Sequence, residues 1–334
     1  MRFLNSKLKI ENTILQNIAK KYGTPAYCYS YKQLRENIND FKKNFKSISP
    51  LICFAIKSNT NLNLIKEIKK FGLGADVVSM GELILALKAG ISPRKIVFSG
   101  VGKTSREINF AIDKNILLIN SESKSEIIEI DKIARIKKKQ VNIGIRLNPN
   151  TDAKTLSQIS TGKKDNKFGV NDKKLNYKKY HSAIKKFLKN KKSQIIFEPG
   201  RSIIGNTGVL ISKVIYIKES YKKNFVILDA AMNDLMRPAL YGAVHRILPL
   251  LKRGKKSKKI YEFVGPICES TDKFTSIKNF QELKEKDFIA ICDVGAYGIS
   301  LSSNYNLRPK PIEILINGSK IRVVKKRQKH HEII

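Results

Sequence analysis

The sequence predicts an α/β fold of parallel strands alternating with helices, followed by a mostly antiparallel β domain. From residue 51 to 147, short apolar runs alternate with longer segments of helical period, and glycine or proline turns separate most of them. Such alternation is typical of βαβ units and a parallel sheet. Beyond residue 206 the helical period fades, and short runs rich in valine and isoleucine follow one another. These runs indicate a second region built from paired strands.

Two helices and one strand are expected before the alternating region. Residues 11–22 and 31–46 carry apolar side chains at helical spacing. Gly23-Thr24-Pro25 interrupts this pattern, because neither glycine nor proline continues a helix well. The short apolar run Ala26–Ser30, between the two helices, is predicted to be a strand.

The alternating region is predicted to hold five strands, with a helix after each of the first four. Right-handed crossovers wind such a series into a barrel or an open sheet. A sixth strand is expected at 193–197, after a basic helix over 175–189. The five strands are expected at 51–56, 75–78, 96–99, 116–120 and 141–147, and the four helices at 62–71, 81–89, 105–114 and 123–138.

The first strand of this region ends in a lysine. Residues 51–56 form an almost unbroken apolar run, short enough for a buried strand, and Lys57 follows directly. Barrels of this class place their chemistry at the C-terminal ends of the strands, where partial burial favours the neutral amine of a Schiff-base lysine. A lysine after an apolar run is otherwise a solvated strand end, so the assignment depends on the rest of the chain. Further polar residues lie at strand ends or, for Asp76, one residue inside the strand: Asp76, Ser79, Ser99, Asn120, Arg146 and Asn148.

Composition places the chain among globular proteins. It has 334 residues, 42% of them hydrophobic, enough for one large domain or two. Its apolar runs stay shorter than the roughly 20 residues of a membrane helix, and the N-terminus lacks the features of a secretory signal. We therefore expect a cytoplasmic protein without a membrane partner. The four cysteines show no C-x-x-C or Cys/His pairing, so neither disulfides nor a metal site are predicted.

The formal net charge of the chain is +37. A nucleic-acid partner would explain such a charge. However, the lysines are spread along the chain, without the interleaved aromatic residues of single-strand binders. We therefore expect no nucleic-acid partner, and a positive field that attracts anionic ligands.

Seven motifs follow one another along the chain and together resemble a known family, the fold-type III, pyridoxal-phosphate-dependent amino-acid decarboxylases. The resemblance extends from about residue 20 to the C-terminus. It implies an alanine racemase-like (β/α)8 barrel with a β domain, acting as a homodimer with shared active sites. The motifs are F-A-I-K-S-N (54–59), G-A-D-V-V-S-M-G-E-L (74–83), I-S-T-G-K-K-D-N-K-F-G (159–169), E-P-G-R (198–201), N-D-L-M-R-P-A-L-Y (233–241), V-G-P-I-C-E-S (264–270) and G-A-Y-G (295–298).

The resemblance implies a carboxy-lyase that converts meso-2,6-diaminopimelate into L-lysine and CO2, the last step of lysine biosynthesis. Its cofactor would be pyridoxal 5'-phosphate, bound covalently by Lys57. Glu198 would face the pyridine nitrogen and keep it protonated, so that the ring accepts the electrons left by CO2. Pro199, Gly200 and Arg201 complete the cofactor-binding motif, and the amides of Gly200 and Arg201 would bind phosphate.

The same resemblance assigns residues to the substrate. Arg201 and Arg237 would capture the distal carboxylate, which suits the bidentate geometry of arginine, and Tyr241 would add a hydrogen bond. Glu269 would pair with the distal ammonium group. Tyr297 would reach both the cofactor and the substrate.

Cys268 and His245 are interpreted differently. Cys268 would be the acid that returns a proton to the α-carbon, reaching across the dimer interface. A lone cysteine is more often a small buried hydrophobic residue, but Pro266 and Glu269 within the same motif favour the catalytic role. His245 follows the Tyr241 motif and is interpreted as structural.

One part of the family pattern has no counterpart here. The family has two further strands before E-P-G-R, one ending in H-I-G-S-Q and one in a triple-glycine loop that holds the cofactor phosphate. Neither motif occurs in this sequence, and about 25 residues separate Gly169 from Ile195, whereas two βα units need roughly 60. We therefore expect six of the eight units, with the break between about 170 and 175. Six strands either close into a smaller, strained barrel or leave two open edges, and cofactor binding should weaken.

The expected domain organisation has three parts. Residues 1–24 form a segment that packs with the β domain, 25–205 form the shortened cofactor-binding barrel, and 206–334 form the β domain. Two alternatives to the diaminopimelate reaction stay open at this point. One is another amino-acid decarboxylase or a racemase of the same fold, and the other is an inactive homologue that acts as a binding or dimerisation module.

Overall fold

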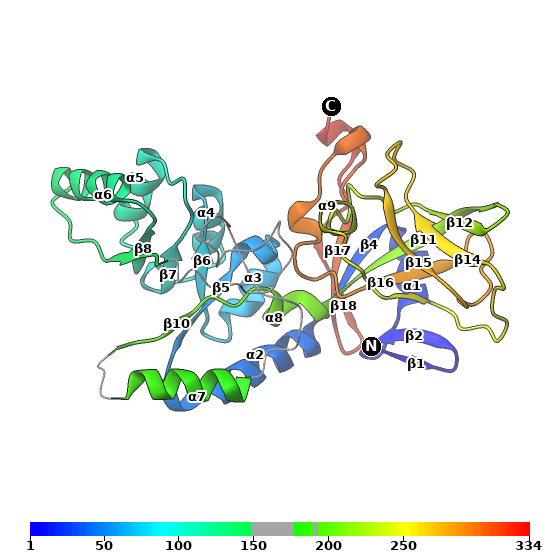
Figure 1. Cartoon of the computed structure of the whole chain (residues 1–334), viewed down its shortest axis with the longest axis horizontal. Coiled ribbons are helices and arrows are strands. Elements are labelled where there is room, and N and C mark those ends of the chain that lie inside the picture. Colours follow the sequence, from blue (N-terminus) through cyan, green and yellow to red (C-terminus); the bar gives the residue numbers. More distant parts are fainter. Residues whose placement is uncertain (148–176, 190–192) are drawn as a thin grey trace. The chain divides into compact units, whose positions relative to one another are not determined.

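The structure, a computed structural model, describes residues 1–147, 177–189 and 193–334. Contacts divide the chain into two compact units. The β unit comprises Met1–Asn37 and Arg201–Ile334, and the parallel-sheet unit comprises Ile38–Gly200. Figure 1 labels helices and strands of both units, and its colour bar gives the residue numbers. The division into an N-terminal segment, a barrel and a β domain stays a prediction.

Among its described residues, the parallel-sheet unit contains six parallel strands in the order β10-β5-β6-β7-β8-β9. Six strands over 51–147 and 193–197 agree with the prediction for these ranges. In the part of the chain that the structure describes, β9 and β10 are edges, so the sheet forms an open half-barrel. The strands are β5 (Leu51–Ala55), β6 (Gly74–Val77), β7 (Ile96–Phe98), β8 (Leu118–Ser121), β9 (Ile143–Ile145) and β10 (Ile196–Phe197).

Four helices connect the strands from β5 to β9, and a polar side chain caps the N-terminus of each. Asn61, Ser79, Thr104 and Ser123 accept hydrogen bonds from backbone N–H groups of the first turn. Such caps satisfy donors that the helix itself leaves unpaired. Each helix start is thus set by local sequence just after a strand ends. The helices of the alternating region are α3 (Leu62–Lys69), α4 (Met80–Lys88), α5 (Ser105–Asp113) and α6 (Lys124–Ile136); α2 (Tyr31–Phe45) precedes them and α7 (Tyr177–Leu188) follows.

The β unit contains a nine-stranded mixed sheet that is mostly antiparallel, as predicted. Its main path is β15-β14-β12-β11-β4-β17-β18, with β16 pairing with β11 and β13. The pairs β12–β14 and β17–β4 are parallel. The strands are β4 (Ala26–Ser30), β11 (Gly208–Glu219), β12 (Lys223–Leu228), β13 (Ile247–Pro249), β14 (Ile260–Val264), β15 (Lys273–Ile277), β16 (Phe288–Cys292), β17 (Ile312–Asn317) and β18 (Lys320–Lys325).

The N-terminal residues fold differently from the prediction of a helix over 11–22. A small antiparallel sheet of β1 (Arg2–Leu4), β2 (Lys7–Ile10) and β3 (Thr13–Ile14) comes first, and helix α1 spans Leu15–Tyr22. The turn between β2 and β3 places Glu11 at a φ of 52°, which is incompatible with a right-handed helix. Leu8, Leu15 and Ile18 are buried in the core of the β unit.

The described residues contain no helix that is long and apolar enough to cross a bilayer.

Candidate active site

Lys57 lies where β5 passes into the short 3-10 turn η2 (Ile56–Ser58). Its Nζ donates a hydrogen bond to Oδ2 of Asp76 at 3.4 Å. Asp76 belongs to β6, the strand next to β5 in the sheet. The Lys57 side chain keeps 41% of its surface exposed, whereas that of Asp76 keeps 1%. The amine is therefore oriented by a buried carboxylate and remains accessible to a ligand.

The Asp76 carboxyl group has an unused acceptor. Its Oδ1 atom is buried and has no hydrogen-bond partner among the described residues. Burial raises the pKa of Asp76, and the Lys57 ammonium and a hydrogen bond from the Ser99 side chain oppose that rise. A buried polar atom without a partner is uncommon in native structures, so this position suits a ligand that brings a hydrogen-bond donor.

Glu198 reaches the same edge of the sheet through the pairing of β10 with β5. The two strands are parallel, and the Ala55 N–H donates to the Pro199 carbonyl at 3.1 Å. Glu198 thus follows its strand at the end where Lys57 follows β5. Although Glu198 retains exposed surface, surrounding protein atoms desolvate its carboxyl group and, with the nearby Asp76 carboxylate, raise its pKa to about 7.

An aromatic cluster attaches β10 and α7 to α2. The ring of Phe45 lies 4.5 Å from that of Phe197 in β10, 5.0 Å from Phe41 and 5.7 Å from Tyr177 in α7, measured between centroids. Phe41 also meets Phe197 edge to face at 5.3 Å. Phe41 and Phe45 are 4% and 2% exposed. This cluster supports the short strand that carries Glu198.

Gly200 allows a close approach between the two strand ends. A Cβ atom at this position would lie 3.1 Å from Cβ of Ser58 and 3.4 Å from Cβ of Ala55. Because the first of these separations is tighter than ordinary contact, a larger residue would push the E-P-G-R segment away from β5. The glycine therefore keeps Glu198 near Lys57.

Arg146 is a charged residue to which sequence reasoning gave no role. It follows β9, and its Nη1 lies 2.8 Å from Oε1 of Glu122. Its positive charge opposes the rise in pKa that burial causes at both Asp76 and Glu198. The signal in the sequence was its position at the end of a strand, as for Asp76, but position alone did not specify a function.

In the β unit, Arg201 and Tyr297 are in contact. Arg201 begins the short helix α8 (Arg201–Ile204), and its guanidinium lies 4.9 Å from the centroid of the Tyr297 ring. Tyr297 has a φ of 58°, a left-handed conformation that costs a non-glycine residue free energy. Such strain concentrates at functional sites, where the surrounding structure maintains it.

Arg237 and Tyr241 are the first and last residues of helix α9 (Arg237–Tyr241). Arg237 is 6% exposed, and its Nη1 lies 3.1 Å from Nε2 of His245. The Arg201 and Arg237 charges both lower the pKa of His245, after the larger effect of burial. Arg237 thus contacts His245, and the charge of Arg201, the other arginine predicted to bind a carboxylate, also acts on that ring.

Cys268 and Glu269 lie on the surface of the β unit, in the turn after β14. The Tyr305 hydroxyl donates to Oε1 of Glu269 at 2.5 Å, a contact that sequence reasoning missed. The other three cysteines are buried, which is the more common position of a lone cysteine.

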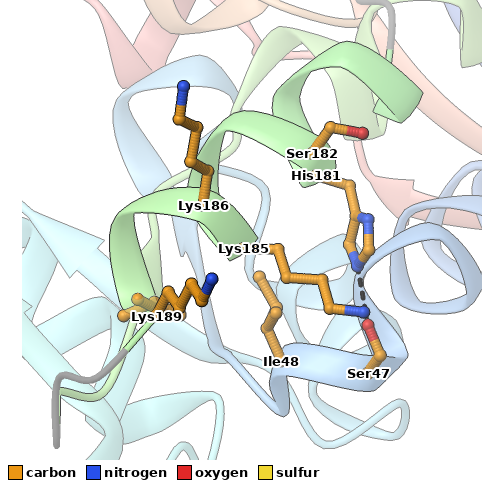
Figure 2. Close-up of a pocket in the computed structure, with 8 residues that line it drawn as sticks. Ser47, Ile48, His181, Ser182, Lys185, Lys186 and Lys189 are labelled. Atoms are coloured by element: carbon orange, nitrogen blue, oxygen red, sulfur yellow. Dashed lines mark hydrogen bonds between the residues drawn. The ribbon is translucent and has the colours of Figure 1, made fainter.

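The predicted 159–169 motif and the break between about 170 and 175 lie outside the described residues. A separate groove lies between α7 and the turn η1 (Lys46–Ile48), where Ser47 Oγ and His181 Nε2 are 2.6 Å apart (Figure 2). Its lysines are Lys185, Lys186 and Lys189. None of the predicted site residues lines this groove.

Known proteins resemble this chain over nearly all of its length. Residues 31–178 match the family described as "Pyridoxal-dependent decarboxylase, pyridoxal binding domain". The chain is 34% identical to the diaminopimelate decarboxylase of Aquifex aeolicus, over 100% of this chain and 96% of that protein. It is 37% identical to that of Helicobacter pylori strain J99, over 94% and 95%. A crystal structure of the H. pylori enzyme complexed with L-lysine is 35% identical, has a TM-score of 0.89, and is matched over 96% of this chain and 98% of that one.

These relatives also contain residues that this chain lacks. The alignment with the A. aeolicus protein extends over 407 positions, more than the 334 residues of this chain. The excess falls within the aligned region, in agreement with the predicted loss of internal βα units. The strand order, the ordered motifs and the identity over the whole length lead to one conclusion: the chain belongs to the diaminopimelate decarboxylase family of pyridoxal-dependent decarboxylases.

Proposed function

We propose that this chain is a carboxy-lyase that uses pyridoxal 5'-phosphate to convert meso-2,6-diaminopimelate into L-lysine and CO2. Membership of the family supports the reaction. The observation that carries the proposal is the shared edge of β5, β6 and β10, where the Lys57 amine and the Asp76 and Glu198 carboxyl groups lie together.

The described residues fit the cofactor at this edge. Lys57 offers an accessible amine, Asp76 offers a buried oxygen with an unused acceptor position, and Glu198 offers a carboxyl group with a pKa of about 7. Lys57 would bind the aldehyde carbon of the cofactor through Nζ. Glu198 would hold the proton on the pyridine nitrogen, because a carboxyl group of this pKa can share a proton with a ring nitrogen at neutral pH. When bound, the cofactor accepts the electron pair left on the α-carbon as CO2 departs.

The substrate roles are proposed from the family motifs. Arg201 and Arg237 would hold the distal carboxylate with Tyr241, and their proximity to one histidine supports a shared anion site. Glu269, oriented by Tyr305, would pair with the distal ammonium group.

Tyr297 and Cys268 are the remaining residues to which the family motifs give a role. Tyr297, stacked on Arg201, would contact both cofactor and substrate. Cys268 Sγ would transfer a proton to the α-carbon after CO2 leaves. Cys268 is exposed within a single chain, as expected of a residue that serves a homodimer interface. We propose a homodimer in the cytoplasm.

The shortened sheet leads us to expect weaker cofactor binding than in relatives with eight units. The sequence has no triple-glycine loop for the phosphate, which leaves the Gly200-Arg201 segment as its proposed anchor. The Lys57 and Glu198 positions do not depend on the missing strands, because β5 and β10 pair directly. We therefore expect the missing units to weaken the affinity for the cofactor more than they impair the reaction of the Lys57 amine with it.

Titration with pyridoxal phosphate tests this proposal. The wild-type chain should develop the visible absorbance band of the lysine-bound cofactor, and Lys57→Ala should remove it. Lys66→Ala, which changes an exposed lysine in α3, is the matched control and should retain the band. A folded wild-type chain without the band, or a band that persists in Lys57→Ala, would contradict the proposal.

A further inference from the structure

His245 is a buried imidazole whose two nitrogens both have partners. His245 is 4% exposed and Arg237, its neighbour in space, is 6% exposed. Nε2 lies 3.1 Å from Nη1 of Arg237, and Nδ1 lies 2.9 Å from the carbonyl oxygen of Cys292. The ring therefore connects the end of β16 to the guanidinium at the start of α9.

The partners determine the protonation of the ring. A carbonyl oxygen only accepts, so Nδ1 must carry a hydrogen, and a guanidinium only donates, so Nε2 must be the bare acceptor. Both requirements are met only by the neutral Nδ1–H tautomer. Burial and the charges of Arg237 and Arg201 lower the pKa of His245, against the Cys292 carbonyl and the Asp293 carboxylate. These surroundings favour the neutral ring at neutral pH.

The backbone around His245 is also fixed, by a turn at the end of α9 and by a hydrogen bond to β16. Helix α9 ends at Gly242, whose φ of 62° lets the chain turn back toward the start of the helix. The Cys292 N–H donates to the Arg246 carbonyl at 2.8 Å. Cys292 thus binds two consecutive residues, Arg246 through its N–H and His245 through its carbonyl oxygen. This clamp holds the imidazole against Arg237.

We propose that His245 is a positioning residue, whose neutral ring accepts from Arg237 and sets the plane in which that guanidinium receives a carboxylate of the substrate. The inference rests on the proposed function, in which Arg237 binds diaminopimelate. Because the guanidinium is a rigid planar fork, fixing one of its N–H groups orients the others.

Two substitutions separate positioning from packing. His245→Leu keeps an apolar side chain but removes the acceptor, and we expect KM for meso-diaminopimelate to rise roughly tenfold to a hundredfold with little change in kcat. His245→Gln supplies an amide oxygen for Arg237 and should restore KM to within a few-fold of wild type. Ile247→Ala, a cavity at a neighbouring buried position, should lower the melting temperature without raising KM.

The pH profile gives a second readout. Below its pKa the protonated ring cannot accept from Arg237, so KM of the wild type should rise toward acid pH, and His245→Gln should lack this rise. An unchanged KM in His245→Leu, or an acid limb that persists in His245→Gln, would overturn the inference.

Two measurements do not depend on decarboxylation. Calorimetric titration with meso-diaminopimelate should show that His245→Leu raises Kd by the same factor as KM. This result is expected even if the wild type releases no CO2. Absence of CO2 release would contradict the proposed function alone. The 15N spectrum of histidine-labelled protein, assigned by comparison with His245→Gln, should show the neutral Nδ1–H tautomer at pH 7.5. An imidazolium or an Nε2–H tautomer there would refute the inference.

Discussion

The pairing of β10 with β5 is predicted to depend on Phe45. This ring is 2% exposed and lies within 6 Å of three other aromatic rings, including Phe197 in β10 and Tyr177 in α7. Truncation of a buried phenylalanine to alanine costs about 3 to 5 kcal/mol, because burial is lost and a cavity remains. Phe45→Ala should therefore loosen the strand that carries Glu198.

Hydrogen exchange measures this effect at two amides. Leu51 N–H donates to Ile195 O at 2.9 Å, and Ala55 N–H donates to Pro199 O at 3.1 Å. If local opening of β10 governs their exchange, a loss of about 3 kcal/mol accelerates it by roughly a hundredfold, at tenfold for each 1.4 kcal/mol.

Two comparisons make the Phe45 result specific. Tyr180→Ala removes a ring of α7 that is 48% exposed and should change exchange little. The amide of Ser99, which donates to Val77 O between β6 and β7, should be less affected than Leu51 and Ala55. Equal exchange of the Leu51 and Ala55 amides in wild type and Phe45→Ala would refute the role of the aromatic cluster.

Four further predictions concern charges and the open edge. Glu198→Gln should still allow cofactor attachment at Lys57 but lower kcat by roughly 100-fold or more, in steady-state kinetics, because proton control at the ring nitrogen is lost. Lys103→Met should reduce the free energy of unfolding by about 3 to 5 kcal/mol in urea denaturation, since it leaves the Glu126 carboxylate, 2.7 Å away and 9% exposed, without its cation. Burial raises the pKa of Asp234 to about 7. The contribution of the protonated Asp234 side chain to the free energy of unfolding is complete below pH about 4 and is lost as the pH rises to 7. Asp234→Asn should therefore remove up to about 4 kcal/mol of the pH dependence of the free energy of unfolding. Ile145, which is 70% exposed on the edge strand β9, should promote self-association, so Ile145→Lys should reduce light scattering of the concentrated protein.

Each of these four has an outcome that contradicts it. A full kcat in Glu198→Gln would remove Glu198 from the chemistry, and a pH profile of stability shared by wild type and Asp234→Asn would exclude that carboxyl group. The double substitution Lys103→Met with Glu126→Leu should recover part of the lost stability, and no recovery would argue against an unpaired charge as the cause. Unchanged scattering in Ile145→Lys would show that the open edge does not associate.

Local sequence signals were sufficient for much of the parallel-sheet unit. Helices α4 and α5 each begin and end within one residue of the predicted ranges 81–89 and 105–114. The caps Ser79 and Thr104 explain this success, because they define helix starts without reference to distant residues. The end of an apolar run identified Lys57 for the same reason.

Features that depend on distant contacts were not predictable in this way. The turn at Glu11 is held by hydrogen bonds from Ser30 and Lys32 to its carboxylate, so the local helical pattern there was misleading. The contact of His245 with Arg237 depends on Cys292, which is 47 residues away along the chain. In the described part of the chain, β9 and β10 are edges; this was one of two expected outcomes, and strand counting could not choose between them.

Release of CO2 from meso-diaminopimelate by the purified, cofactor-loaded chain tests the central claim most directly. The account predicts release by the wild type, loss in Lys57→Ala, retention in Lys66→Ala, and little release from ornithine. A folded chain that carries the cofactor and releases no CO2 from meso-diaminopimelate would contradict it.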